Sequence, residues 1–185
     1  MQIIYFANSP FTYDNIAVDW EDANSDYAKQ YENEELSWSN LKDLTDVELY
    51  NCPNMTQLPD FLYDLPELQS LNIACNRGIS AAQLEADWTR LADDEDTGPK
   101  IQIFYMGYNN LEEFPASASL QKMVKLGLLD CVHNKVRHLE AFGTNVKLTD
   151  LKLDYNQIEE IPEDFCAFTD QVEGLSLIHI SEPTR

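Results

Sequence analysis

Basic side chains are scarce in this sequence: 12 Lys and Arg stand against 33 Asp and Glu, for a formal net charge of −21. A surface with this much negative charge repels phosphate backbones and acidic head groups, which argues against nucleic acid and anionic membranes as partners. Cationic or neutral partners are favoured. Long apolar runs are also lacking, because no stretch of about 18 apolar residues is present to cross a bilayer.

Catalytic signatures are missing too. The chain has only six glycines, and it contains no glycine-rich phosphate loop, no nucleophile elbow and no Cys-x-x-Cys pair. Hydrophobic residues nevertheless make up 44% of the chain, which is enough for a packed core rather than a disordered acidic tail. We therefore expect a folded protein whose function does not depend on one of these motifs.

One irregular spacing of apolar residues recurs along the chain. Its fullest example is Leu148-x-x-Leu151-x-Leu153-x-x-Asn156-x-Ile158-x-x-Ile161-Pro162. This spacing fits neither a helix nor a plain alternating strand. Five copies share the frame, and their turn positions 52, 76, 109, 134 and 156 are separated by 24, 33, 25 and 22 residues. Repeats of this period predict a solenoid of stacked units.

Each position of the repeat has a physical reason. The last two apolar residues of Leu-x-x-Leu-x-Leu alternate with polar ones, which predicts a short strand with one buried face. The Asn that follows stands where the chain leaves the sheet, and its amide can satisfy backbone groups that the turn leaves unpaired. The Leu-x-x-Leu-Pro segment then returns the chain along the outer side.

This pattern resembles the leucine-rich repeat family, specifically bacterial secreted or surface members with Leu-Pro after the Asn turn. The resemblance covers residues 41–177. It implies an α/β solenoid with short parallel strands on the concave face and helices or turns on the convex face. It also implies a role in binding proteins or other macromolecules, at an extracellular or cell-surface location.

Four segments stand outside the regular repeats. We interpret 1–8 as a partial repeat, 9–40 as an acidic and partly helical insertion, and 178–185 as an adapter-derived or frayed tail. Residues 80–99 form the fourth, where a Ser80-x-x-Gln83 capping box predicts a helix. Both ends of the chain are interpreted as cut within a repeat, which makes it a fragment whose secretion signal would lie outside the sequence.

Strand alternation also predicts which side chains face a partner. The candidate ligand-binding residues on the concave face are Tyr50, Tyr105, Tyr108, Asp130, His133, Asp150, Lys152, Asp154 and Tyr155. Among them, Tyr108, His133 and Tyr155 occupy one repeat position on successive strands about 4.8 Å apart. Such a stripe suits a binding surface. Two alternatives are mutual stacking that only supports the sheet, and cover by a flanking loop.

Catalytic and metal chemistry fit these positions poorly. Asp130, Asp150 and Asp154 lie within reach of one another, but Lys152 stands among them on an open face, which argues against a hydrolase. Cys131 points inward and His133 outward, so the two cannot share an ion. The acidic stretch 93–99 lacks the spacing of an EF-hand and is interpreted as a solvated loop. We expect no enzyme activity, no cofactor and no metal.

The four cysteines are interpreted as unbridged. Cys52, Cys131 and Cys166 are expected in the core, and Cys75 is expected to be exposed.

The leading hypothesis is a monomeric, non-catalytic recognition module that binds a protein partner through the concave face. A glycan ligand is the alternative within binding, since Tyr rings beside Asp and Asn also suit sugars. A structural spacer in a larger surface protein is the alternative of a different class.

Overall fold

The computed structural model describes residues 3–7, 43–95, 97–141, 147–165 and 174–176. The acidic insertion expected at 9–40, the tail at 178–185 and Cys166 lie outside these described residues.

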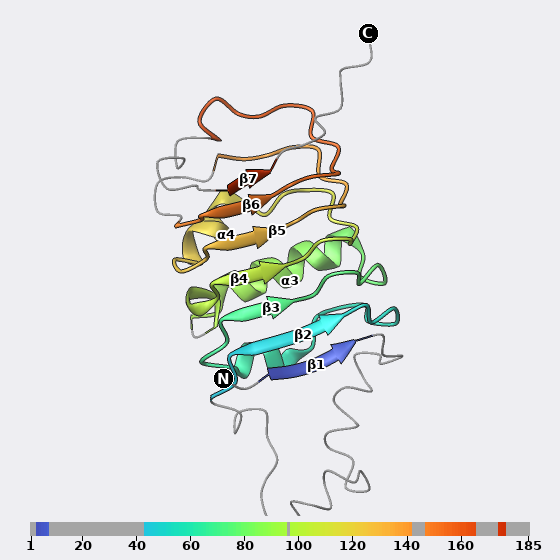
Figure 1. Cartoon of the computed structure of the whole chain (residues 1–185), viewed down its shortest axis with the longest axis vertical. Helices are drawn as coiled ribbons and strands as arrows, with labels where there is room; N and C mark the ends of the chain where they lie inside the picture. Colours follow the sequence, from blue (N-terminus) through green and yellow to red (C-terminus); the bar gives the residue numbers. More distant parts are fainter. Residues whose placement is uncertain (1–2, 8–42, 96, 142–146, 166–173, 177–185) are drawn as a thin grey trace, which may run out of the picture.

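The described strands form a single parallel sheet in which neighbours along the chain are neighbours in space (Figure 1). The strands are β1 (Ile3–Ala7), β2 (Asp46–Tyr50), β3 (Ser70–Asn72), β4 (Ile103–Tyr105), β5 (Leu128–Asp130), β6 (Asp150–Lys152) and β7 (Gly174–Ser176). A parallel sheet in strict sequence order requires the chain to circle back after every strand. The fold is therefore an α/β solenoid, as the repeat spacing predicts.

The register of the sheet places equivalent repeat positions side by side. Leu71 of β3 aligns with Phe104 of β4, which aligns with Leu129 of β5. The central residues of β3 to β6 are completely buried, as are Val47 and Leu49 of β2. Their neighbours on either side are partly exposed in β3 to β6, as expected for strands with one face in the core.

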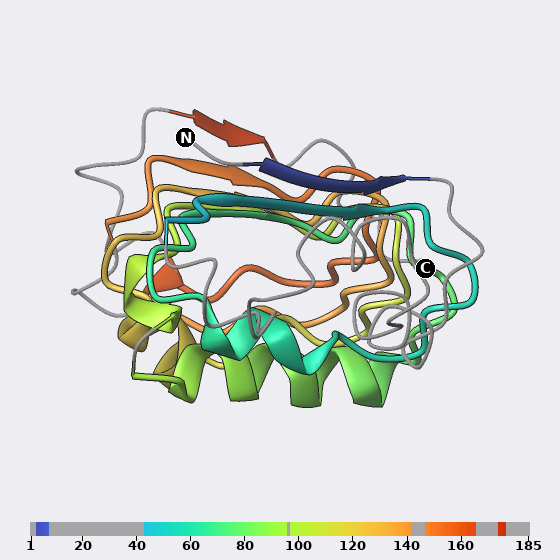
Figure 2. The same cartoon turned by 90° about the horizontal axis from the view of Figure 1, so that it is seen from below.

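Helices and turns make up the layer opposite the strands (Figure 2). They are η2 (Asp60–Asp64), α3 (Ala81–Asp93), η3 (Gly98–Lys100) and α4 (Ser117–Lys122). The expected helix of the long repeat is α3, and the Ser80 side chain caps it by accepting from the Gln83 N–H at 3.2 Å. Trp88 of α3 is buried and stacks on Phe104 of β4, with ring centroids 4.9 Å apart, so that helix and sheet share one core.

Asp87 is a buried carboxylate on α3 that the apolar pattern does not reveal. It accepts hydrogen bonds from the Leu58 N–H at 2.8 Å and from Gln83 Nε2 at 2.7 Å. Gln83 thus completes a bond within the helix instead of closing a capping box. Desolvation by burial raises the pKa of Asp87, against the opposing effect of both hydrogen bonds. The carboxylate ties the long helix to the preceding repeat.

The asparagines at the turn positions form the expected ladder of buried amides. Each Nδ2 donates to the carbonyl three residues earlier in its own repeat and to a carbonyl of the preceding repeat. Each Oδ1 accepts a backbone N–H of the preceding repeat. These donors are Cys52 for Asn76, Asn76 for Asn109, Leu111 for Asn134 and Val136 for Asn156. The ladder pairs backbone groups that the turns would otherwise bury unsatisfied.

The cysteines within the described residues are free thiols. Cys52 and Cys131 are buried as expected, and burial raises the pKa of the Cys131 thiol well above its usual value. Cys75 is half-buried, which corrects the expectation of an exposed side chain. The residue lies in a turn with φ 66°, where its side chain borders a pocket together with Asn51 and Arg77.

The described part of the acidic loop is held by neighbouring groups. Asp93 forms an ion pair with Lys122 of α4, and Asp94 accepts the Thr97 N–H at 2.7 Å. Nowhere in the described ranges do three His, Cys, Asp or Glu side chains gather as a metal site would need. Among those residues, none of the helices combines the length and the apolarity that crossing a bilayer requires.

Candidate binding surface

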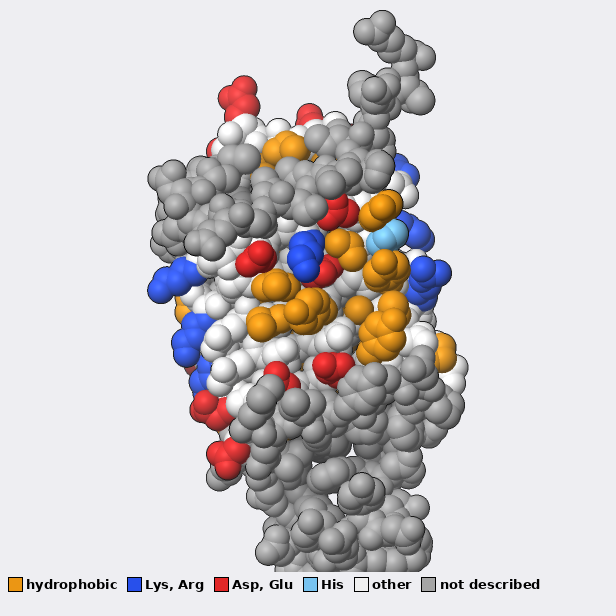
Figure 3. Space-filling view, viewed as in Figure 1, with side chains coloured by type: hydrophobic (Ala, Val, Ile, Leu, Met, Phe, Trp, Pro, Cys, Tyr) orange, Lys and Arg blue, Asp and Glu red, His pale blue; other side chains and the backbone are white. Residues whose placement is uncertain are grey.

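The outward side of the sheet, which we call the strand face, carries an apolar group in its middle. Ile103 of β4 and Leu128 of β5 are partners in the sheet register, and both are partly exposed. Tyr105, two residues after Ile103, is partly exposed as well. We call these three residues the central patch. Figure 3 shows hydrophobic side chains gathered over the strands, with charged side chains among them.

Charged residues lie beside the central patch. Asp130 is in register with Tyr105 on one side and with Lys152 on the other. Asp130 and Lys152 form an ion pair, with Lys152 Nζ 3.7 Å from Asp130 Oδ2. The Lys152 side chain is 44% exposed, so solvent screens the pair and its contribution to stability is under about 1 kcal/mol. Asp130 also accepts the Val132 N–H at 3.1 Å, which fixes the carboxylate at the end of the strand.

The remaining acidic groups of the strand face stand on both sides of the patch. Asp46 and Glu48 lie on β2, and Asp150 and Asp154 lie on or just after β6. All four are partly exposed. Asp46 accepts from the Thr45 hydroxyl at 2.5 Å, and Asp150 accepts from the Thr149 hydroxyl at 3.1 Å. Lys152 is therefore one cation among several carboxylates.

Tyr108, His133 and Tyr155 form a column of stacked rings, which we call the ring column. The Tyr108 and His133 centroids are 4.2 Å apart at 17°, and the His133 and Tyr155 centroids are 4.0 Å apart at 8°. Tyr108 is 40% exposed and Tyr155 is 55% exposed, while His133 between them is half-buried. The column thus presents ring edges and part of its faces to solvent.

The ring column lies on a row of left-handed backbone. Tyr108, His133 and Tyr155 have φ values of 59°, 53° and 57°, and the equivalent residues Asn51 and Cys75 have 51° and 66°. Asn adopts this conformation readily, whereas aromatic residues do so rarely. Strand alternation alone does not predict the turn at this position. The turn brings the three rings into parallel stacking.

The rings of the ring column are stacked on one another and are also partly exposed to solvent. Mutual stacking, one of the alternatives to binding, is observed. The exposed area of the rings is large enough for a partner to cover as well, so binding by the column stays a prediction. Aromatic residues in left-handed backbone are costly by about 1–2 kcal/mol each, and a stacked pair returns about 0.5–1.5 kcal/mol.

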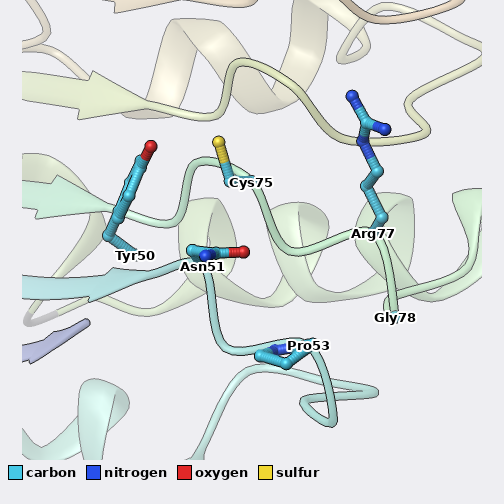
Figure 4. A pocket seen from close by; sticks show the side chains of 6 residues that line it. All are labelled: Tyr50, Asn51, Pro53, Cys75, Arg77 and Gly78. Carbon is cyan, nitrogen blue, oxygen red and sulfur yellow. The ribbon is translucent and has the colours of Figure 1, made fainter. Parts of the chain in front are cut away.

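Tyr50 lies apart from the ring column and lines a pocket of about 500 Å³. The pocket is formed by two successive turns, and Figure 4 shows the six lining residues: Tyr50, Asn51, Pro53, Cys75, Arg77 and Gly78. A Cβ at Gly78 would lie 2.6 Å from the Pro53 carbonyl oxygen, so that only glycine lets the two turns pack this closely.

The structure thus divides the candidate residues into separate groups. It unites Tyr108, His133 and Tyr155 in the ring column, and Asp130 with Lys152 in an ion pair. Tyr105 belongs to the central patch and Tyr50 to the pocket.

Ile103 and Leu128 are not among the binding residues expected from the sequence. Apolar side chains at outward positions of two adjacent strands were the signal for them. The pocket residues Cys75 and Arg77 carry no comparable signal in the sequence.

Comparison with known proteins locates the chain among repeat proteins. The model of the family described as Leucine Rich Repeat matches residues 147–168. A crystal structure of a leucine-rich repeat protein from Bacteroides thetaiotaomicron is 97% identical with a TM-score of 0.85, over 97% of this chain and 21% of that one. A leucine-rich repeat protein from Bacteroides eggerthii is 60% identical with a TM-score of 0.80, over 93% of this chain and 28% of that one.

A curated relative is more distant. Toll-like receptor 7 of Drosophila melanogaster is 31% identical over 107 residues, which are 57% of this chain and 7% of the receptor. The chain therefore spans less than a third of the length of each of these three proteins.

Proposed function

We propose that this chain, which belongs to the leucine-rich repeat family, recognises a protein partner through its strand face and catalyses no reaction. Leucine-rich repeat domains are in general protein-interaction modules and are typically non-enzymatic. The finer proposal concerns which surface binds and what chemistry it favours in the partner.

One observation carries the proposal: apolar and aromatic side chains are exposed on the strand face next to each other. Ile103, Tyr105 and Leu128 are not needed to close the core, because the alternate positions of the same strands fill it. Protein interfaces are enriched in aromatic residues with a polar rim around them. The central patch and the ring column supply the aromatic and apolar side chains, and the surrounding carboxylates supply the polar rim.

The charge of the strand face favours a partner with basic residues. Carboxylates of β2 and β6 flank the central patch, and Lys152 is already paired with Asp130. A partner segment with an apolar anchor between basic residues would complement this face. Such complementarity mainly raises the association rate and makes it sensitive to salt.

A glycan is the second candidate ligand, favoured by the proximity of Tyr105 to Asp130. A sugar could stack on the ring and donate hydroxyl hydrogen bonds to the carboxylate. We rank it below a protein because Asp130 is already engaged by the Val132 N–H and by Lys152.

The test is selection from a library of displayed random peptides with the purified chain as bait. We expect enriched peptides to combine an aromatic or aliphatic residue with Lys or Arg, and to bind less tightly as salt rises. The double variant Tyr105→Ala, Tyr108→Ala should lose these peptides while its thermal unfolding stays cooperative. Val124→Ala is the matched control, since Val124 is 44% exposed in the loop before β5.

Three results would count against the proposal. Peptides that bind the double variant as well as the unaltered chain would remove the strand face from the mechanism. Selective signals on a glycan array, with no peptide enriched, would favour the sugar ligand. Failure to enrich any ligand in either format would favour a spacer role.

We also propose an extracellular or cell-surface location, on the resemblance to secreted bacterial repeat proteins. Biotinylation of intact cells with a membrane-impermeant reagent tests it, because an intracellular protein would be labelled only after lysis.

A further inference from the structure

The ring column ends at Tyr108 on the side of the preceding repeat. His133 covers one face of the Tyr108 ring at 4.2 Å. In a column of parallel rings, the other face of the last ring points along the column axis, which here leads to the rung of Cys75. Tyr108 is 40% exposed, in keeping with a ring that is stacked on one side only.

The row itself continues past the column. The Cys75 N–H donates to the Gly107 carbonyl and the Asn51 N–H donates to the Ala74 carbonyl, each at 3.0 Å. Both residues share the left-handed conformation of the ring positions. Successive rungs of a parallel sheet are about 4.8 Å apart, so the backbone provides two more rungs at the same spacing. These rungs carry a thiol and a short amide instead of rings.

The pocket lies over these two rungs. Asn51 and Cys75 both line it, and Figure 4 shows them between Tyr50 on one side and Arg77 on the other. The sulfur of Cys75 points toward the next repeat, away from Pro53 (Figure 4). The pocket therefore lies on the two rungs that precede Tyr108, with the Tyr50 ring at its border.

The chemistry of the lining favours a flat π-system. None of the six lining residues that the structure describes is a carboxylate. Arg77 is exposed and forms no salt bridge with any residue that the structure describes. A guanidinium over an aromatic face is a favourable contact, and this chain contains one, with Arg90 Cζ 3.7 Å from the centroid of the Tyr63 ring.

We propose that the pocket receives an aromatic side chain of the protein partner, which lies between the Tyr50 ring and the Arg77 guanidinium. The inference rests on the proposed recognition function and adds a second anchor at the edge of the strand face. A sugar fits less well, because its hydroxyls need several acceptors and the described lining residues supply no carboxylate.

The test is a titration of the isotope-labelled chain followed by two-dimensional amide NMR, with N-acetyl-L-tryptophanamide as the probe. We expect saturable shifts centred on the amides of Cys75, Arg77 and Gly78. N-acetyl-L-leucinamide, which has no planar ring, and methyl β-D-glucopyranoside should shift them at least several-fold more weakly. Equal shifts with the leucine probe or the glucoside, or shifts centred elsewhere, would overturn the proposal.

Two substitutions sharpen the test. Cys75→Tyr places the chain's own ring on the rung next to Tyr108 and should abolish probe binding. Arg77→Gln should weaken binding about three-fold, as expected for the loss of one exposed cation–π contact. The matched control is Arg137→Gln, an exposed arginine of a later turn, which should leave binding unchanged. Undiminished binding by Arg77→Gln would remove the guanidinium from the site.

The peptide selection separates this inference from the function on which it rests. If the selected peptides still require the central patch but the tryptophan probe does not bind in the pocket, only the pocket proposal is refuted. Loss of both results would refute the recognition function itself.

Discussion

Substitution of Tyr155 can separate the backbone strain of the ring column from its stacking energy. Tyr155 has φ 57°, stacks on His133 at 4.0 Å and is 55% exposed. It lies at the end of the column, so that its replacement removes the stacking contact with His133 and leaves the contact between Tyr108 and His133 in place. Two variants remove the same ring: Tyr155→Asn, whose new side chain tolerates left-handed backbone, and Tyr155→Ala, whose new side chain does not.

The magnitudes follow from these three quantities. Loss of one stacked pair costs about 1 kcal/mol, and loss of burial for less than half a ring costs about another 1 kcal/mol. Asn recovers most of the strain of about 1–2 kcal/mol that Tyr carries at positive φ. We therefore expect Tyr155→Asn to lower the free energy of unfolding by about 1 kcal/mol or less, and Tyr155→Ala to lower it by about 2 kcal/mol.

Urea denaturation followed by circular dichroism measures both variants against the unaltered chain. The informative quantity is the difference between the variants, because every contact of the lost ring cancels in it. If Tyr155→Ala proved as stable as Tyr155→Asn, the backbone of the row would carry no strain, and stacking alone would explain the choice of residues there.

Three other substitutions test separate parts of the molecule. Asn134→Ala should lower the free energy of unfolding by about 2 kcal/mol, because the Leu111 N–H loses its acceptor and the Met106 and Cys131 carbonyls each lose one of two amide donors; a loss below about 1 kcal/mol in urea denaturation would contradict the ladder. Asp87→Asn should gain stability relative to the unaltered chain as the pH rises. The raised pKa of Asp87 means that stability is lost as pH rises from 3.8 through the folded-state pKa, and thermal melts at several pH values that show a constant difference would refute this. Lys152→Ala should cost under about 1 kcal/mol, since its ion pair with Asp130 is solvent-screened; a larger loss in the same urea assay would show that the pair is structural.

The sequence predicts the core and the order of the sheet because the same spacing of apolar residues recurs in each repeat. Phe104, Leu129 and Leu151 occupy one frame position, and the structure aligns them as buried neighbours. The insertion helix is predicted as well, since Ser80 begins it and Trp88 lies on its apolar face. In each case several repeats, or several residues of one helix, show the same pattern of buried positions.

Features that depend on a single contact between repeats are harder to predict. Asp87 appears as an ordinary polar residue of a helix, and its burial depends on the Leu58 N–H, which lies 29 residues earlier in the chain. The pocket depends on the close approach of two turns at Gly78. Neither the buried Asp87 nor the pocket gives a repeated sequence pattern, because each occurs at a single place in the solenoid.

The left-handed row shows how a departure from local preference can indicate function. Asn51 fits the conformation of this row, and a chain selected only for stability could place Asn or Gly at each of its rungs. Instead, Tyr108 and Tyr155 stand there, at a backbone cost that the stacking of each on His133 only about offsets. Core positions of the same repeats follow their preferences throughout. Conflict with local preference that is confined to one exposed row is typical of functional sites. The rings are therefore favoured as part of the recognition surface, and their removal is expected to impair binding more than folding.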